Sequence, residues 1–244
     1  MDEQKLISLM PEDSSLNEWQ RCMKQAILSI QGSRLGYDTS WGSTNGNVHS
    51  GCTKDREHLG TRIMRKGNPA GSYCCGAVME AFMVAWSLWT ERADKDVTVE
   101  DMREMYANVF LFDRESKDTQ YGAMGGLIKM SNNHDWLKVE TSDEVDRFPF
   151  GAMVQMRFKE DPYAANSGHS VIALGHGVYD GNPCLVVWSS NYGHDGDFHY
   201  DPKSGLYTVI NGDGQPSGHG PDYYVKDRVK DGYKRRFFGG WILP

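Results

Sequence analysis

The chain has 244 residues, of which 39% are hydrophobic and 11% aromatic, enough to bury a substantial core within one large domain. Its net charge of -7 argues against nucleic acid as a partner, because nucleic-acid affinity depends on clustered Lys and Arg, and the dense basic run at 234–236 stands by itself. The sequence predicts no transmembrane segment, and its first residues lack an apolar signal core. We therefore expect a cytoplasmic protein, a chain that begins after a removed signal, or export by another route.

The N-terminal half has the pattern of a helical layer. Apolar residues recur at helical spacing over 15–31, with Ser14 or Ser15 as the expected N-cap. Residues 32–73 lack periodicity and are rich in Gly, Ser, Thr and Asn, which predicts a long loop that forms a wall of a substrate cleft. Further helices are predicted over 74–92, apolar on most faces and therefore central, over 99–112 with Thr98 as cap, and over 122–130.

From residue 148 the pattern changes to strands. Runs with β-branched or aromatic residues between turn signals predict strands over 151–158, 169–176, 184–190, 205–210 and 235–243, with hairpin turns at 180–183 and 194–197. Helices followed by an antiparallel sheet indicate an α+β fold. We expect one domain over 1–244, with an N-terminal helix and cleft-forming loop (1–73), a helical half (74–135) and a β-sheet half (148–244).

The dipeptide Cys74-Cys75 directly precedes the predicted central helix. A thiol in the first turn of a helix lies at the positive end of the helix dipole, which favours the thiolate. The backbone N–H of Cys74 is also a ready donor to an oxyanion. The motif therefore predicts a nucleophile, with Cys74 preferred over Cys75. The competing interpretation is a pair of buried cysteines that only pack the helix.

The other cysteines indicate neither a metal site nor a cofactor. Cys22 and Cys184 are interpreted as small buried hydrophobes, and Cys52 is placed in a polar loop. No two pairs have the spacing of a structural zinc site. The polar segments 194–199 and 211–220 are interpreted as a tight turn and a long surface loop, since neither matches a zinc or calcium loop.

Two polar residues in the sheet half complete a candidate catalytic set. His169 begins a strand-like apolar run, and Asn191 ends the following one. A cysteine nucleophile needs a base within hydrogen-bond reach and a group that orients the base. His169 supplies the base and Asn191 the orienting side chain, which predicts thiolate attack on an amide carbonyl and a thioacyl intermediate that is then hydrolysed. His176, later in the same strand, is expected to be solvated.

These segments together resemble a known family. Cys74-Cys75-Gly76 before an apolar helix resembles the Asp-Cys-Ser-Gly motif of the NlpC/P60 cell-wall peptidases, with Cys74 at the nucleophile position. Residues 148–156 resemble their Pro-Gly-Asp-Leu-Val strand, and 168–175 are similar to their His-Val-Gly-Ile-Tyr-Leu-Gly strand, which aligns His169 with the catalytic base. Residues 35–42 resemble a segment whose active-site tyrosine aligns with Tyr37. The resemblance implies a papain-like fold.

The chain also departs from that family. Tyr73 stands where the family has Asp before the cysteine, and Ala152 replaces the Asp of the strand motif. The family commonly uses a histidine as third catalytic residue, whereas residues 188–192 look more like the Glu-x-Asn of CHAP amidases, with Ser189 at the Glu and Asn191 at the Asn. Tyr73 or Tyr37 is the expected side-chain oxyanion donor.

The resemblance implies a peptidoglycan stem-peptide endopeptidase or amidase. Trp41, in the polar segment, is expected to line the substrate groove. The same machinery would serve a thiol amidase, deamidase or acyltransferase on a protein or small-molecule substrate. A third alternative is a catalytically inactive module that binds peptide or glycan.

Overall fold

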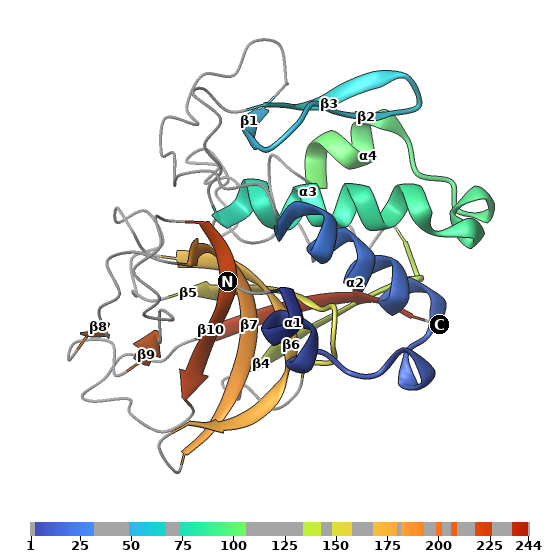
Figure 1. The fold of residues 1–244 in the computed structure, drawn as a ribbon. Helices are drawn as coiled ribbons and strands as arrows, with labels where there is room; N and C mark the ends of the chain where they lie inside the picture. The colour runs from blue at the N-terminus through green and yellow to red at the C-terminus, as the bar shows by residue number, and fades with distance from the viewer. Residues whose placement is uncertain are drawn as a thin grey trace.

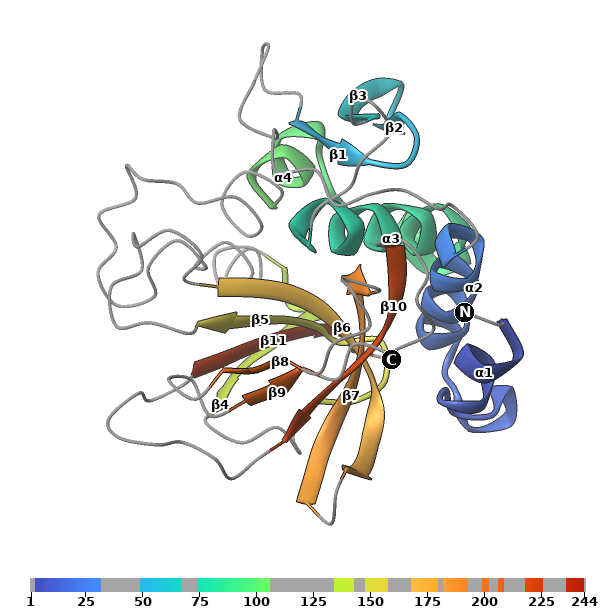
Figure 2. The ribbon, with the colours of Figure 1, turned by 60° about the vertical axis from the view of Figure 1, so that its left-hand side comes forward.

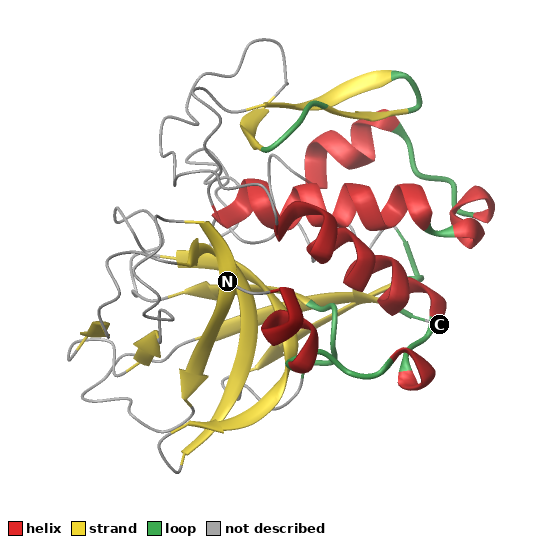
Figure 3. Cartoon of the chain, viewed as in Figure 1, coloured by secondary structure: helices red, strands yellow, loops and turns green. Residues whose placement is uncertain are grey.

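The computed structural model describes residues 3–31, 49–66, 74–105, 134–142, 148–157, 168–179, 182–192, 199–201, 206–208, 218–225 and 236–243. These residues form a mixed helix and sheet structure, which confirms the α+β class (Figure 1). A large twisted sheet packs beneath helices α2 and α3, and a small sheet covers the opposite side of α3 (Figures 1 and 2). Figure 3 shows the same division, with helices between the two sheets.

The described helices include three of the predicted ones, with different ends, together with one α-helix and two 3-10 helices that the sequence pattern does not predict. Their bounds are α1 Glu3–Ser8, η1 Asp13–Ser15, α2 Glu18–Gln31, α3 Cys74–Leu88, η2 Thr90–Asp94 and α4 Val99–Glu104, where η denotes a 3-10 helix. The predicted capping role of Thr98 is confirmed, since its side chain and that of Asp101 form a capping box. The predicted helix over 122–130 lies outside the described residues, as does the predicted extension beyond residue 105.

Two predicted helix boundaries are wrong. Asn17, and not Ser14 or Ser15, caps α2, because its Oδ1 accepts from the backbone N–H of Gln20 at 2.8 Å while Gln20 Oε1 accepts from the N–H of Asn17 at 3.1 Å. The central helix ends at Leu88 and not at residue 92. Glu18 accepts hydrogen bonds from both the backbone N–H and the hydroxyl of Thr90, so the chain after Leu88 turns towards α2.

The strands include every one predicted, together with several that the sequence pattern does not reveal. Their bounds are β1 His49–Cys52, β2 Arg56–His58, β3 Thr61–Lys66, β4 Leu137–Ser142, β5 Met153–Arg157, β6 Gly168–Tyr179, β7 Asn182–Tyr192, β8 His199–Asp201, β9 Leu206–Thr208, β10 Gly218–Val225 and β11 Arg236–Ile242. The first three form a small sheet inside the segment predicted to be a loop. That prediction is wrong for 49–66, because β3 buries the consecutive residues Ile63 and Met64 and so lacks the alternation of a half-buried strand.

The large sheet has the strand order β10-β7-β6-β5-β11-β4, and its neighbouring strands are antiparallel. β10 contradicts the prediction that the surface loop continues through residue 220. Pro221 and two glycines conceal this strand in the sequence, and β10 tolerates them because it lies at the edge of the sheet.

Alternation along the strands divides the apolar side chains between the two faces of the large sheet. Ile172 and Leu174 of β6 belong to the core cluster that contains α2 and α3. Val171 and Ala173 belong to a second cluster on the other face, with Phe148 and Val187. Side chains of a strand alternate between the two faces of a sheet. Where the register between β5 and β6 is regular, the even-numbered positions of β6 therefore lie on the face that packs against the helices, and the odd-numbered positions lie on the face of the second cluster.

Helix α3 is central, as its apolar character predicts, because it packs on α2, β6, β7 and β1. One charged residue interrupts its buried surface. Glu80 is fully buried and accepts hydrogen bonds from the N–H and the hydroxyl of Thr53, both at 2.6 Å, and from Nε and Nη2 of Arg56 at 3.0 and 2.7 Å. This carboxylate therefore joins the small sheet to the helix that begins with the candidate nucleophile.

Candidate functional site

The candidate nucleophile lies at the first residue of α3, as predicted. Cys74 is buried, with 8% of its surface exposed, and Cys75 is half-buried. The two sulfur atoms lie 3.7 Å apart, within the distance of a hydrogen bond between thiols. The helix start supplies the backbone N–H groups and the positive dipole end that a thiolate requires.

Ser170 of β6 contacts this pair. Its Oγ lies 3.4 Å from the Sγ of Cys75, and only 1% of the surface of Ser170 is exposed. Ser170 has the even parity of Ile172 and Leu174, which agrees with its position on the helix side of the sheet. The sequence analysis does not single out Ser170. Its position beside His169, where polar residues precede the apolar run of the strand, is the feature that could have indicated it.

The surroundings of Cys75 disfavour its thiolate. The hydrogen bond with Cys74, followed by burial, raises the pKa of the Cys75 thiol well above its usual range, while the hydrogen bond with Ser170 acts in the opposite direction. Cys75 therefore remains protonated near neutral pH and can serve as a hydrogen-bond donor to a Cys74 thiolate.

The backbones of the two other candidate catalytic residues lie on neighbouring strands. His169 of β6 pairs with Met156 of β5, and β6 pairs with β7 at Ile172 and Trp188. The described pairing of β6 with β7 runs from Ile172 and Trp188 to Tyr179 and Asn182, so His169 and Asn191 both lie just beyond its end.

His169 is the neighbour in β6 of the residue that contacts Cys75. Its position has the odd parity of Val171 and Ala173, whereas the contact with Cys75 comes from Ser170. The side chains of His169, Ser189 and Asn191 lie outside the described residues, although their backbones belong to β6 and β7. Tyr37, Trp41 and Tyr73 lie outside the described residues altogether.

The remaining cysteines are structural where they are described. Cys22 is buried in α2, and burial raises the pKa of its thiol, which confirms the interpretation as a small hydrophobe. Cys52 lies in β1 and is fully buried, so its placement in a polar loop is wrong. Burial, followed by the negative charge of Glu80, raises the pKa of the Cys52 thiol far above its usual range. Cys184 lies in β7, with its side chain outside the described residues.

The described residues contain no group of three or more His, Cys, Asp or Glu side chains that would hold a metal ion. The predicted turn at 194–197 lies outside them. His176, expected to be solvated, is exposed. Among the helices described, none is long and apolar enough to cross a membrane.

Comparison of the chain with protein-family models, with curated protein sequences and with solved structures finds no significant match.

Proposed function

We propose that this protein is a cysteine hydrolase with a papain-like arrangement, in which Cys74 is the nucleophile, His169 the general base and Asn191 the residue that orients the base. The observation that carries the proposal is the start of α3 at Cys74, in a helix that packs on the two strands containing His169 and Asn191. The placement of His169 and Asn191 on the neighbouring strands β6 and β7 supports the second half of the set.

The proposed reaction is acyl transfer. His169 takes the proton of Cys74, the thiolate attacks an amide carbonyl, and backbone N–H groups at the start of α3 stabilise the oxyanion. The protonated imidazole then gives its proton to the leaving amine, and water hydrolyses the thioacyl intermediate. Cys75 keeps its proton throughout and donates to the sulfur of Cys74 before attack.

The proposed substrate is an amide bond in the stem peptide of peptidoglycan. This part of the proposal rests on the resemblance of residues 74–76, 148–156 and 168–175 to the NlpC/P60 and CHAP enzymes. Tyr37, Trp41, Tyr73 and Ser189 are proposed to bind substrate or the oxyanion. A protein or small-molecule amide is the alternative substrate for the same machinery.

One specific observation favours a second candidate function. The described contact of β6 with the cysteine pair comes from Ser170, through Cys75. A domain in which His169 does not reach Cys74 would bind peptide or glycan without cleaving it. The two functions differ in the reactivity that they predict for Cys74.

Alkylation of the native protein separates the two. The full chain is treated with iodoacetamide near pH 6, the modified cysteines are mapped by peptide mass spectrometry, and the experiment is repeated on His169→Ala. The matched control is His176→Ala, which removes an exposed histidine from the same strand.

A thiolate and imidazolium pair predicts fast, selective labelling of Cys74 that falls at least tenfold in His169→Ala and stays unchanged in His176→Ala. Slow labelling of every cysteine, or equal effects of the two variants, would reject the proposed hydrolase in favour of the binding module. Digestion of purified peptidoglycan, with Cys74→Ala as the inactive reference, then tests the substrate by the fragments released.

A further inference from the structure

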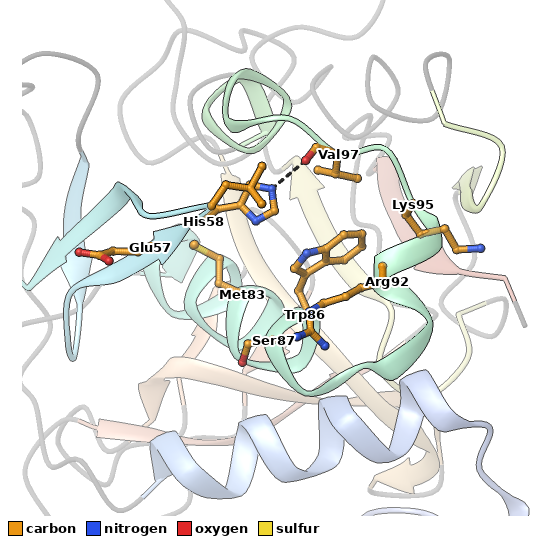
Figure 4. A pocket seen from close by; sticks show the side chains of 10 residues that line it. Glu57, His58, Met83, Trp86, Ser87, Arg92, Lys95 and Val97 are labelled. Atoms are coloured by element: carbon orange, nitrogen blue, oxygen red, sulfur yellow. Dashed lines mark hydrogen bonds between the residues drawn. The ribbon is translucent and has the colours of Figure 1, made fainter.

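A cavity of about 370 Å³ opens at the other end of α3 from Cys74. Its walls come from the turn between β2 and β3, from the last turns of α3 and from η2 with the residues that follow it (Figure 4). Trp86 in its wall is twelve residues from Cys74, which corresponds to about 18 Å along a helix. The cavity is therefore separate from the candidate nucleophile, and its volume is at the lower end of the range for small-molecule sites.

The floor of the cavity is apolar and rigid. Met83, Trp86 and Val97 line it, and each is at most 6% exposed. The indole of Trp86 is held on three sides, with ring-centroid distances of 5.8 Å to Phe82, 5.7 Å to Trp89 and 5.3 Å to Trp136. An aromatic platform that is already ordered costs a ligand little conformational entropy on binding.

His58 forms one wall and presents a defined hydrogen-bonding group. Its Nε2 lies 2.8 Å from the carbonyl oxygen of Val97, and its ring packs edge-on against Trp86 at 6.4 Å (Figure 4). A carbonyl only accepts, so Nε2 carries a proton in this bond. Nδ1 of the neutral ring is consequently an acceptor, suited to an N–H group of a ligand.

Arg92 supplies the charge. Figure 4 shows its side chain passing Trp86 towards Ser87, while the side chains of Lys95 and Glu57, which also line the cavity, extend away from Trp86. One Nη1 proton of Arg92 is used on the carbonyl of Trp89 at 2.6 Å, and among the described residues the guanidinium makes no further hydrogen bond or ion pair. The unused donors of a guanidinium match the two oxygens of a carboxylate.

Leu59 stands at the rim in a conformation that its side chain disfavours. Its φ is 48°, in the left-handed region, and 74% of its surface is exposed. Asn or Gly would suit this turn position better than an exposed leucine. Local strain of this kind is common beside ligand sites, where a side chain has a use that folding does not require.

We propose that this cavity binds a small amphipathic carboxylate that carries an apolar or aromatic body and an N–H group. The body lies over Trp86 and Met83 beneath Leu59, the carboxylate pairs with Arg92, and the N–H donates to Nδ1 of His58. N-acylated amino acids and the C-terminal residue of a peptide share this chemistry. The site does not depend on the proposed hydrolase activity, because none of its residues belongs to the candidate catalytic set.

Binding to the full chain is measured by isothermal titration with N-acetyl-L-phenylalanine and with its amide, which has the same shape without the charge. We expect the acid to bind at least tenfold more tightly than the amide, since the amide cannot form the charged pair with Arg92. A hexapeptide that ends in phenylalanine, with a free or an amidated C-terminus, is the second pair of probes. Tighter binding of the free-acid peptide than of the acylated amino acid identifies a chain terminus as the occupant, and the reverse identifies a free small molecule.

Variants then locate the site. Ser87→Trp fills the cavity from an exposed helical position, and its matched control is Ser29→Trp on α2, because both serines are exposed and donate to the carbonyl three residues earlier. We expect Ser87→Trp to reduce affinity at least tenfold and Ser29→Trp to leave it unchanged. Arg92→Gln should remove the preference for acid over amide without changing the affinity for the amide.

Leu59→Asn distinguishes a role in binding from a role in folding. Asn tolerates the left-handed conformation, so we expect the midpoint of thermal unfolding to stay level or rise while affinity for the acid falls about fivefold. Equal affinities for acid and amide, undiminished binding by Ser87→Trp, or no binding of any probe would each overturn the proposal.

Discussion

The Sγ of Cys75 lies 3.4 Å from the Oγ of Ser170, which joins the first turn of α3 to the strand β6. The same sulfur lies 3.7 Å from the Sγ of Cys74 on its other side. The two contacts act on Cys75 in opposite directions, because Cys74 raises the pKa of its thiol and Ser170 lowers it. Cys75 is thus a protonated link between the candidate nucleophile and the sheet.

Removal of Cys74 should lower the pKa of Cys75. A thiol with a raised pKa is alkylated only as the pH approaches that pKa, and Cys74 is the largest cause of the increase. We therefore expect Cys74→Ala to move the half-maximal rate of Cys75 alkylation to lower pH, measured by iodoacetamide labelling between pH 6 and pH 11.

Ser170→Ala should shift the same profile in the opposite direction, to higher pH, because it removes the hydrogen bond that favours the thiolate. Cys22→Ala is the control, since that buried thiol lies on a different helix, α2. Shifts of the same sign in Cys74→Ala and Ser170→Ala would contradict the arrangement of the three groups.

Glu80→Ala should destabilise the protein strongly. The substitution leaves the N–H of Thr53 and part of the Arg56 guanidinium without an acceptor in a buried position. Removal of one partner of a buried ion pair costs about 3 to 5 kcal/mol in the free energy of unfolding. Urea denaturation measures this change.

The matched control for that experiment is Glu140→Ala, which breaks the exposed ion pair between Lys138 and Glu140. We expect a loss below about 1 kcal/mol there, since water screens exposed pairs. Similar losses in Glu80→Ala and Glu140→Ala would show that the link between the small sheet and α3 contributes little.

Asn17→Ala tests the observed start of α2. Loss of its cap on the backbone N–H of Gln20 should lower the free energy of unfolding by about 1 kcal/mol. Ser14→Ala, at a position expected from the sequence to cap the helix, should change it by less than about 0.5 kcal/mol. Thermal or urea unfolding followed by circular dichroism measures the change for each variant. A larger loss in Ser14→Ala than in Asn17→Ala would support the helix start that the sequence predicted.

Gly239→Ala should disrupt the second core cluster. A Cβ at this position in β11 would lie 2.1 Å from two ring atoms of Phe148, a fully buried side chain. Such a clash forces the ring or the strand to move, and overpacking of this kind costs about 1 to 3 kcal/mol or more.

Gly175→Ala in β6 is the control for that clash, because its Cβ would meet only an ordinary contact at 4.0 Å. We expect little change in its urea unfolding curve. Equal unfolding midpoints for Gly239→Ala and Gly175→Ala would mean that Phe148 is not packed against β11 as described.

The sequence by itself determined the elements whose signals are local. The apolar run after Cys74 predicted a central helix, Thr98 predicted the start of α4, and β-branched or aromatic residues between turn signals predicted β5, β6 and β7. It also placed the cysteine pair at a helix start. Each of these features depends on residues a few positions apart, where backbone geometry and side-chain pattern decide the outcome.

Only the tertiary structure decided the features that join distant segments. The strands β1 and β2 are too short to show a pattern, and β3 does not alternate. Glu80 holds this sheet through Thr53 and Arg56, more than twenty residues earlier in the chain. β10 is a strand because β7 provides its hydrogen-bonding partner at the sheet edge, despite Pro221. The residue of β6 that contacts Cys75 is decided by which face of the sheet packs against α3. Because side chains alternate between the two faces, a shift of β6 by one residue would move Ser170 to the opposite face.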